Sequence, residues 1–226
     1  MEHGIPTTWF TADTHLGHAN IVKLCLRPFL TQTEEERARE DPRGNWRVST
    51  ETVDRHDAAL IDAINAAVQP EDTLWVLGDF CWGKLEEAKA YRERIACRNV
   101  NLVWGNHDHR SIEPAFAKTI EQGMVSADGH KIWLNHYPMR SWHKSFHGSW
   151  HLYGHVHSRL QHEDEQTPWL LAKDVGVDAC DYKPMSIEDL RRYMAPREKA
   201  FAEHRAAVIA HDESADRSYL VRGSLA

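Results

Sequence analysis

Aspartate and histidine residues spaced two positions apart are the feature of this sequence most suited to chemistry. Asp13 and His15 form one such pair, and His155 and His157 form another. In an extended backbone, side chains two positions apart lie on the same face, so each pair can chelate a metal ion. Further oxygen and nitrogen donors of the kind that bind divalent cations are Asp79, Asn106 and His136. The sequence therefore predicts a site for divalent metal ions.

Glycine directly precedes three of these donors. Gly78 stands before Asp79, Gly105 before Asn106, and Gly154 before His155. Glycine at such positions is consistent with backbone that turns sharply or approaches another segment closely. Asp79 is the candidate bridging ligand, because two cations about 3.5 to 4 Å apart commonly share an oxygen ligand.

Cysteine takes no part in these clusters. The four cysteines are widely spaced and form no C-x-x-C pair: Cys25, Cys81, Cys97 and Cys180. This spacing supports neither a zinc knuckle nor a redox motif, and we expect buried free thiols. A site built without cysteine is typical of an open catalytic centre rather than a closed structural zinc site.

The donors follow short apolar runs of the kind that form buried strands. These runs are Trp9–Ala12, Leu74–Leu77, Leu102–Trp104, Ile132–Leu134 and Leu152–Tyr153. Apolar periodicity predicts helices over 50–68, 85–97 and 112–122. Asp128-Gly129 predicts a hairpin turn, Ser186–Asp189 forms a capping signal, and a C-terminal helix is expected over 196–212. Strands alternating with helices predict an α/β sandwich whose ligand site lies at the carboxyl ends of the strands.

Length and charge limit the kind of protein this can be. The chain has 226 residues, enough for one domain over 1–226, and a formal net charge of -7. This charge disfavours binding of long nucleic acid, which relies on many Lys and Arg contacts. No apolar run approaches the roughly 20 residues of a membrane span, and the N-terminus lacks the features of a secretory signal. We therefore expect a cytoplasmic protein that acts on a small substrate.

The segment 31–48 interrupts this organisation with charged and turn-forming residues. We expect an insertion that is a solvated loop or a short exposed helix, with a lid beside the site as the alternative. The segment 196–226 is expected to form the C-terminal helix and a polar tail.

Five motifs, taken in chain order, resemble those of the calcineurin-like metallophosphoesterase superfamily. They are Asp13-Thr14-His15, Gly78-Asp79, Gly105-Asn106-His107-Asp108, His136, and Gly154-His155-Val156-His157. Longer strings, at 18–21, 136–142 and 175–178, are similar to a subgroup of small bacterial and phage members. The resemblance implies a four-layer α/β/β/α sandwich of two mixed sheets, with a dinuclear metal site at the strand C-terminal ends.

The resemblance also implies a role for each matched residue. One metal ion would be held by Asp13, His15, Asp79 and His157, and the other by Asp79, Asn106, His136 and His155. His107 would face the substrate as general acid or charge partner, and Asp108 would orient it. The ions are expected to be Mn, Fe, Zn or Ni, and a metal-bridging hydroxide is expected to attack phosphorus.

Other side chains are weaker candidates. Arg140 and His143 follow the His136 motif and are candidates for contact with the substrate phosphate. His18 and Asn20 are expected to cap the first helix. Among the tryptophans, those outside strand patterns are candidates for stacking on a nucleobase: Trp46, Trp142 and Trp150.

The predicted function is hydrolysis of a phosphate ester, with a phosphodiester slightly favoured and a nucleotide among the candidate substrates. Three alternatives stay open. The chain could be a nuclease on short or single-stranded nucleic acid, a phosphomonoesterase, or a non-catalytic scaffold with the same fold. The scaffold is disfavoured because every ligand position carries a matching residue type.

Overall fold

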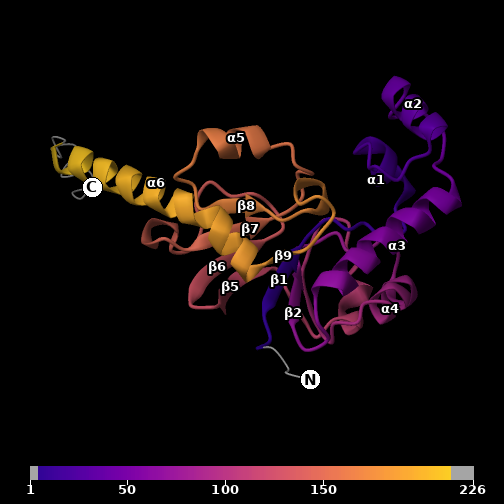
Figure 1. Ribbon diagram of the computed structural model, residues 1–226, viewed down its shortest axis with the longest axis horizontal. Coiled ribbons are helices and arrows are strands. Elements are labelled where there is room, and N and C mark those ends of the chain that lie inside the picture. The colour runs from indigo at the N-terminus through magenta and orange to yellow at the C-terminus, as the bar shows by residue number, and fades with distance from the viewer. Residues whose placement is uncertain (1–4, 215–226) are drawn as a thin grey trace, which may run out of the picture.

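The computed structural model describes residues 5–214 and contains two mixed sheets (Figure 1). The first sheet has the strand order β4-β3-β2-β1-β9. Its strands are β1 (Thr8–Thr11), β2 (Thr73–Val76), β3 (Asn99–Val103), β4 (Lys118–Ile120) and β9 (Met185–Ser186). Strands β1 to β4 are mutually parallel, and β9 pairs antiparallel with β1. The carboxyl ends of β1, β2 and β3 therefore share one edge.

The second sheet has the strand order β5-β6-β7-β8. Its strands are β5 (Gln122–Ala127), β6 (His130–Asn135), β7 (Trp150–Tyr153) and β8 (Ala172–Asp174). The first two form the predicted hairpin, turning at Asp128 and Gly129, and β6, β7 and β8 are parallel. This sheet too presents the carboxyl ends of β6 and β7 together.

Helices cover the sheets on their outer sides (Figure 1). They are α1 (Ala19–Leu24), α2 (Gln32–Glu40), α3 (Thr50–Ala67), α4 (Leu85–Glu93), α5 (Gln161–Gln166) and α6 (Ile187–Ser214). Short 3-10 helices are η1 (Arg110–Ala115), η2 (Ser145–His147) and η3 (Val177–Ala179). Helices α3 and α4 lie on one side, and α5 and α6 flank the four-stranded sheet. The predicted four-layer sandwich of two mixed sheets is confirmed.

Alternation of side chains along the strands builds two cores. In β2, Leu74 and Val76 pack with residues of α3 and α4, whereas Trp75 and the following Leu77 pack against the second sheet. This is the two-residue period of a strand buried on both faces. The cores hold the sheets face to face and fix the relative positions of the loops at their carboxyl ends.

The helix predicted over 112–122 is wrong. The segment forms η1, which contains Pro114, and then the separate strands β4 and β5. Proline has no N–H for helical bonding, and Lys118–Ile120 instead pairs with the exposed edge of β3. The helix predicted over 85–97 is real but ends at Glu93.

The C-terminal helix begins earlier than predicted. Ser186 and Asp189 form the expected reciprocal cap, with the Asp189 N–H donating to the Ser186 Oγ at 3.0 Å. Helix α6 starts directly after this cap and continues through Pro196. The predicted polar tail beyond residue 214 lies outside the described residues.

The insertion 31–48 is a compact helical unit. Thr31 and Glu34 form a capping box at the start of α2. Behind the helix, Ala38, Trp46 and Val48 form a small buried cluster. The segment therefore contains a short helix, and its role as an insertion or as a lid stays a prediction. Within residues 5–214, no helix is long and apolar enough to cross a membrane.

Candidate metal centre

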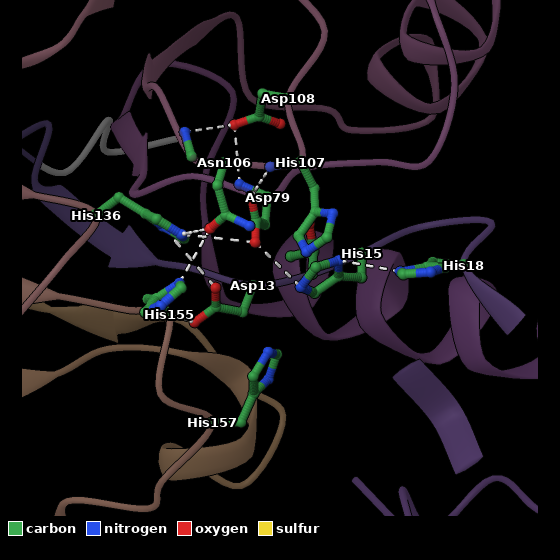
Figure 2. A network of polar contacts seen from close by, with 12 residues as sticks. Asp13, His15, His18, Asp79, Asn106, His107, Asp108, His136, His155 and His157 are labelled. Atoms are coloured by element: carbon green, nitrogen blue, oxygen red, sulfur yellow. Dashed lines mark hydrogen bonds and ion pairs between the residues drawn. The ribbon is translucent and has the colours of Figure 1, made fainter. Parts of the chain in front are cut away.

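The predicted ligands occupy the loops that leave five strands at their carboxyl ends. Backbone hydrogen bonds continue past the strands and join these loops: Asp13 N–H donates to the Gly78 carbonyl at 3.0 Å, and His15 N–H to the Asp79 carbonyl at 2.8 Å. In the second sheet, Gly154 N–H donates to the His136 carbonyl at 2.9 Å. The sheet register thus determines which ligands meet, and Figure 2 shows them gathered around Asp13 and Asp79.

Asp79 occupies the middle of the cluster. Its Oδ2 lies 3.4 Å from His15 Nε2 and 3.5 Å from His136 Nε2. Its other oxygen, Oδ1, accepts a hydrogen bond from the His107 N–H at 2.9 Å. One carboxylate oxygen is therefore held by backbone while the other faces imidazoles on two sides, which suits a ligand shared by two cations.

The remaining ligands divide into two groups on either side of Asp79. On one side, donor atoms of Asp13, His15 and His157 all lie within 4.8 Å of one another. On the other, Asn106 Oδ1 lies 3.1 Å from His136 Nε2 and 3.0 Å from His155 Nδ1. These groupings match the two ligand sets that the resemblance implies.

The orientation of His136 suits cation binding. Its Nδ1 lies 2.8 Å from the Leu77 carbonyl, to which only an N–H can donate. The neutral ring therefore carries its proton on Nδ1 and directs the Nε2 lone pair at the oxygens of Asp79 and Asn106. Lone pairs that converge repel one another unless a positive charge lies among them.

Two buried polar atoms of the cluster have no hydrogen-bond partner in the described part of the chain. They are Asp13 Oδ1 and His15 Nε2. An unpaired buried polar atom costs about 1 to 3 kcal/mol. Both belong to predicted ligands of the same ion, so a divalent cation would satisfy both, and the residues present fit the group that the fold implies.

Burial shifts the pKa values of these residues so that their neutral forms are favoured. A nearby cation would reverse the shift of the carboxyl groups and add to that of the imidazoles. Burial raises the pKa of Asp13 and of Asp79, because the charged carboxylate is poorly solvated there. It lowers the pKa of His15, His136 and His155, which keeps these imidazoles neutral. Neutral imidazole is the form that binds metal ions, and a nearby cation would favour the carboxylate anions.

Asp178 and Arg27 hold His157 in place. The Asp178 Oδ2 lies 2.7 Å from His157 Nδ1. Arg27 donates two hydrogen bonds to the same carboxylate, from Nη2 to Oδ2 at 2.8 Å and from Nε to Oδ1 at 3.0 Å. Burial lowers the pKa of His157, but the hydrogen bonds to Asp178 and Cys25, together with the nearby Asp13 carboxylate, outweigh burial and raise the pKa to about 10. Nδ1 is bound to Asp178, so a cation would bind at Nε2 by displacing the proton that this nitrogen carries in the metal-free protein.

Arg27 also links this pair to the backbone of the first ligand loop. It is fully buried and donates from Nη2 to the Asp13 carbonyl at 2.8 Å and from Nη1 to the Thr14 carbonyl at 3.1 Å. Sequence reasoning missed both side chains. Asp178 is the last residue of Val175–Asp178, one of the strings that resemble the subgroup of small bacterial and phage members. Nothing near Arg27 in the sequence indicates a partner in the site.

The expected contact between Asp108 and His107 is not made. Both Asp108 oxygens accept from backbone instead: Oδ2 from the N–H of Asp79 and of Gly105, and Oδ1 from the N–H of Phe80, each at 2.9 Å. A largely buried carboxylate takes the nearest amide donors, which here belong to the two adjacent ligand loops. Asp108 therefore fixes these loops relative to each other rather than orienting an imidazole (Figure 2).

His107 lies at the edge of the cluster with its side chain exposed. Its ring centroid is 5.4 Å from that of His15 and 5.9 Å from that of His18 (Figure 2). The His18 ring does not cap α1 as predicted. It faces His15, with 3.4 Å between the two Nδ1 atoms, and burial lowers its pKa to about 4. His107 is thus the exposed imidazole on this side of the cluster, open to an incoming substrate.

Arg140 and His143 lie elsewhere. Arg140 lines a surface cavity of about 240 Å³ together with Trp142, Phe146 and Trp169. The His143 ring lies 5.9 Å from that of Trp133. Their positions give no support to the prediction that they contact the substrate phosphate.

Gly78 shows how tightly the loops meet. A Cβ added there would lie 2.3 Å from His136 Nδ1 and 2.8 Å from the Gly105 Cα, at a φ of +91°. Gly129 provides a matched control, because it also has positive φ, +81°, but a Cβ there meets nothing within 4 Å. We expect Gly129→Ala to lose about 1 kcal/mol from the left-handed backbone alone. Gly78→Ala should lose about 1 to 3 kcal/mol more through crowding.

Urea unfolding of both variants measures this difference. Equal losses of unfolding free energy in the two variants would contradict the close packing of the Gly78 and Gly105 loops against His136.

Comparison with known proteins agrees with this geometry. Residues 52–172 match the model of the calcineurin-like phosphoesterase superfamily domain. The chain is 30% identical over 186 residues to an uncharacterised protein of Methanocaldococcus jannaschii, covering 80% of this chain and 86% of that one. It is 29% identical over 103 residues to the Gene 66 protein of Mycobacterium phage L5, of which it covers 39%.

Similarity to a solved structure supports the fold. A protein of unknown function from Aquifex aeolicus superposes with a TM-score of 0.59 at 21% identity, covering 83% of this chain and 99% of that protein.

Proposed function

Because the chain belongs to the calcineurin-like phosphoesterase superfamily, we propose that it hydrolyses a phosphodiester with the help of two divalent cations. One cation would be held by Asp13, His15, Asp79 and His157, and the other by Asp79, Asn106, His136 and His155. The observation that supports this most is the position of Asp79 Oδ2, between His15 Nε2 at 3.4 Å and His136 Nε2 at 3.5 Å.

The charge of the site fits an anionic substrate. Two divalent ions carry +4 and the carboxylates of Asp13 and Asp79 carry -2, which leaves a local charge of about +2. The site can therefore attract a phosphate although the whole chain has a net charge of -7. Bound there, the cations would lower the pKa of a coordinated water and stabilise charge on the phosphoryl oxygens.

The residues around the cations have separate tasks. His136 and His157 are each held through Nδ1, by the Leu77 carbonyl and by Asp178, so that Nε2 of each ring would be the atom that holds a cation. Asp108 holds the Asp79 and Gly105 loops together through their N–H groups. The exposed His107 is the group placed to give a proton to the leaving oxygen or to pair with a phosphoryl oxygen.

A panel of phosphoesters tests the proposal. It should contain a phosphomonoester, bis-p-nitrophenyl phosphate, a cyclic nucleotide and a dinucleotide, each assayed separately with Mn, Fe, Zn, Ni and Mg. We expect bis-p-nitrophenyl phosphate to be hydrolysed faster than the monoester with at least one metal. Faster cleavage of the monoester would identify a phosphomonoesterase, and no cleavage with any metal would favour the scaffold.

The Asp178 contact yields a prediction on metal affinity. We expect Asp178→Asn to weaken divalent-metal binding by about 10- to 100-fold, because the carboxylate that orients His157 is lost. Isothermal titration calorimetry on metal-free protein measures this without any need for turnover. Asp181→Asn is the matched control, since Asp181 is exposed and pairs only with Lys183, at 3.5 Å, among the described ion pairs. Unchanged affinity in Asp178→Asn would show that His157 needs no such support.

A further inference from the structure

Two large aromatic side chains are exposed next to the metal centre. Trp82 is 53% exposed and Tyr137 is 44% exposed. The Trp82 ring stacks on His18, with centroids 4.2 Å apart and planes 11° from parallel. The Tyr137 ring packs edge-on against His155, at 4.6 Å, and against His136, at 5.0 Å. Each ring is therefore held in place by the histidines of the site while keeping part of its surface open.

The two rings lie on opposite sides of the cluster. Figure 2 shows His15 and His18 on one side of Asp79, and His136 and His155 on the other. Trp82 stacks on His18, at the first side, and Tyr137 packs on His155, at the second. A phosphate bound between the two groups of ligands would have an exposed aromatic ring on each side, Trp82 on one and Tyr137 on the other.

The tryptophans that the sequence favoured for stacking do not serve this purpose. They are buried: Trp46, Trp142 and Trp150. Trp46 packs inside the insertion cluster, and the other two belong to the core between the sheets. Trp82, which follows the Gly78-Asp79 motif by three residues, takes their place.

A single exposed aromatic side chain is ordinary on a protein surface and indicates nothing by itself. Here two rings lie on either side of the proposed metal site, and each is packed against a histidine of the cluster that limits its freedom. Exposed aromatic faces are the surfaces on which unpaired nucleobases stack, with little dependence on base identity. A phosphodiester joins two organic groups, so a dinucleotide could place one base on each ring.

We propose that Trp82 stacks on the nucleobase at one side of the scissile phosphate and Tyr137 on the nucleobase at the other side. The substrate is then a dinucleotide or a short single strand. This inference rests on the proposed function and names its substrate class. Water adds its oxygen to phosphorus, the bond from phosphorus to one ribose oxygen breaks, and that oxygen takes up a proton. Duplex nucleic acid is excluded because its bases are already stacked on their neighbours, and the net charge of -7 disfavours long strands.

Three substrates test the inference: dithymidine phosphate, and two analogues in which one or the other thymine is replaced by hydrogen. For the wild type we expect kcat/KM to fall about tenfold on loss of either base. Trp82→Ala should lower kcat/KM for dithymidine phosphate about tenfold. In this variant, removing the thymine that stacks on Trp82 should have no further effect on kcat/KM, whereas removing the other thymine should still lower it. In Tyr137→Ala the two analogues should exchange these effects. Tyr137→Phe should behave as wild type, because the ring is kept.

Matched controls come from exposed aromatic residues away from the centre. Trp169→Ala and Phe146→Ala remove exposed rings that line the cavity beside Arg140, and both should leave all three rates unchanged. Equal rates of the wild type on the three substrates would overturn the inference. So would an equal loss on all three in Trp82→Ala and Tyr137→Ala, because that would indicate general damage to the site.

The outcome also separates this inference from the proposed function. Hydrolysis of bis-p-nitrophenyl phosphate without hydrolysis of dithymidine phosphate would overturn the dinucleotide substrate and leave the phosphodiesterase in place. If the wild type cleaves no diester with any metal, the proposed function itself fails.

Discussion

Asp79→Asn is expected to lower the rate of bis-p-nitrophenyl phosphate hydrolysis by about 10³-fold or more while the protein stays folded. The neutral amide cannot serve as the shared anionic ligand, so at least one cation is lost along with several kcal/mol of transition-state stabilisation. Each 1.4 kcal/mol or so corresponds to a factor of ten in rate. Steady-state kinetics at saturating metal measures the loss, and circular dichroism checks the fold.

The pKa of Asp79 explains why the fold should survive. Burial raises this pKa above its ordinary value of 3.8. A carboxyl group with a raised pKa stabilises the folded state most at pH values below its ordinary pKa, and this contribution is lost as the pH rises through the higher, folded-state value. At neutral pH the buried Asp79 carboxylate therefore lowers the free energy of unfolding of the metal-free wild type, and asparagine removes this destabilisation. Metal-free Asp79→Asn should unfold at the same temperature as metal-free wild type, or higher.

Asp128→Asn is the matched control for activity. Asp128 is exposed and pairs with Arg191 at 2.8 Å in the hairpin turn, so its replacement should leave the rate unchanged. His155→Ala, which removes a ligand from the second cation alone, should also abolish hydrolysis. Full activity in Asp79→Asn or in His155→Ala would disprove the two-cation mechanism.

Arg27→Met is expected to lower the free energy of unfolding by about 3 to 5 kcal/mol, because it breaks a buried ion pair and removes the hydrogen bonds that the guanidinium donates. Asp178 would lose both hydrogen bonds from the guanidinium, and the carbonyls of Asp13 and Thr14 would lose theirs. Urea unfolding in the presence of a chelator measures the effect on the protein alone.

Arg98→Met is the control for an arginine that pairs at the surface. Arg98 and Glu71 are 77% and 51% exposed, and such pairs contribute about 0 to 1 kcal/mol. The loss in Arg27→Met should exceed that in Arg98→Met several-fold. Similar losses in both variants would mean that the Arg27–Asp178 pair does not stabilise the first ligand loop.

The parts of the fold and site that the sequence predicted have local causes. A strand such as 74–77 is visible as a short apolar run, and the donor that follows it must then lie at the carboxyl end of the strand. The turn at Asp128 and the cap at Ser186 also depend on residues that are neighbours in sequence. That the candidate donors lie together follows from the same pattern, because parallel strands bring their carboxyl ends to one edge of a sheet. Their assignment to two ions came from the resemblance and stays a prediction.

The parts that were missed depend on contacts between distant residues. Arg27 and Asp178 are separated by 151 positions, and no local pattern pairs them. Whether Trp82 or Trp142 is exposed is decided by packing between the sheets. The segment 112–122 has apolar spacing that suits a helix, but Pro114 and the free edge of β3 favour a different structure. Asp108 was given the wrong partner because backbone amides of two other loops are closer than any sequence motif indicates.

The number of divalent ions bound per chain tests the central claim most directly. Metal-free protein should be reconstituted with Mn, freed of excess ion and measured by elemental analysis, with hydrolysis of bis-p-nitrophenyl phosphate followed on the same sample. We predict two equivalents per chain, with hydrolysis dependent on the ion. Fewer than one equivalent, with no hydrolysis on addition of Mn, would contradict a dinuclear centre and identify the chain as a scaffold that keeps the fold without the chemistry.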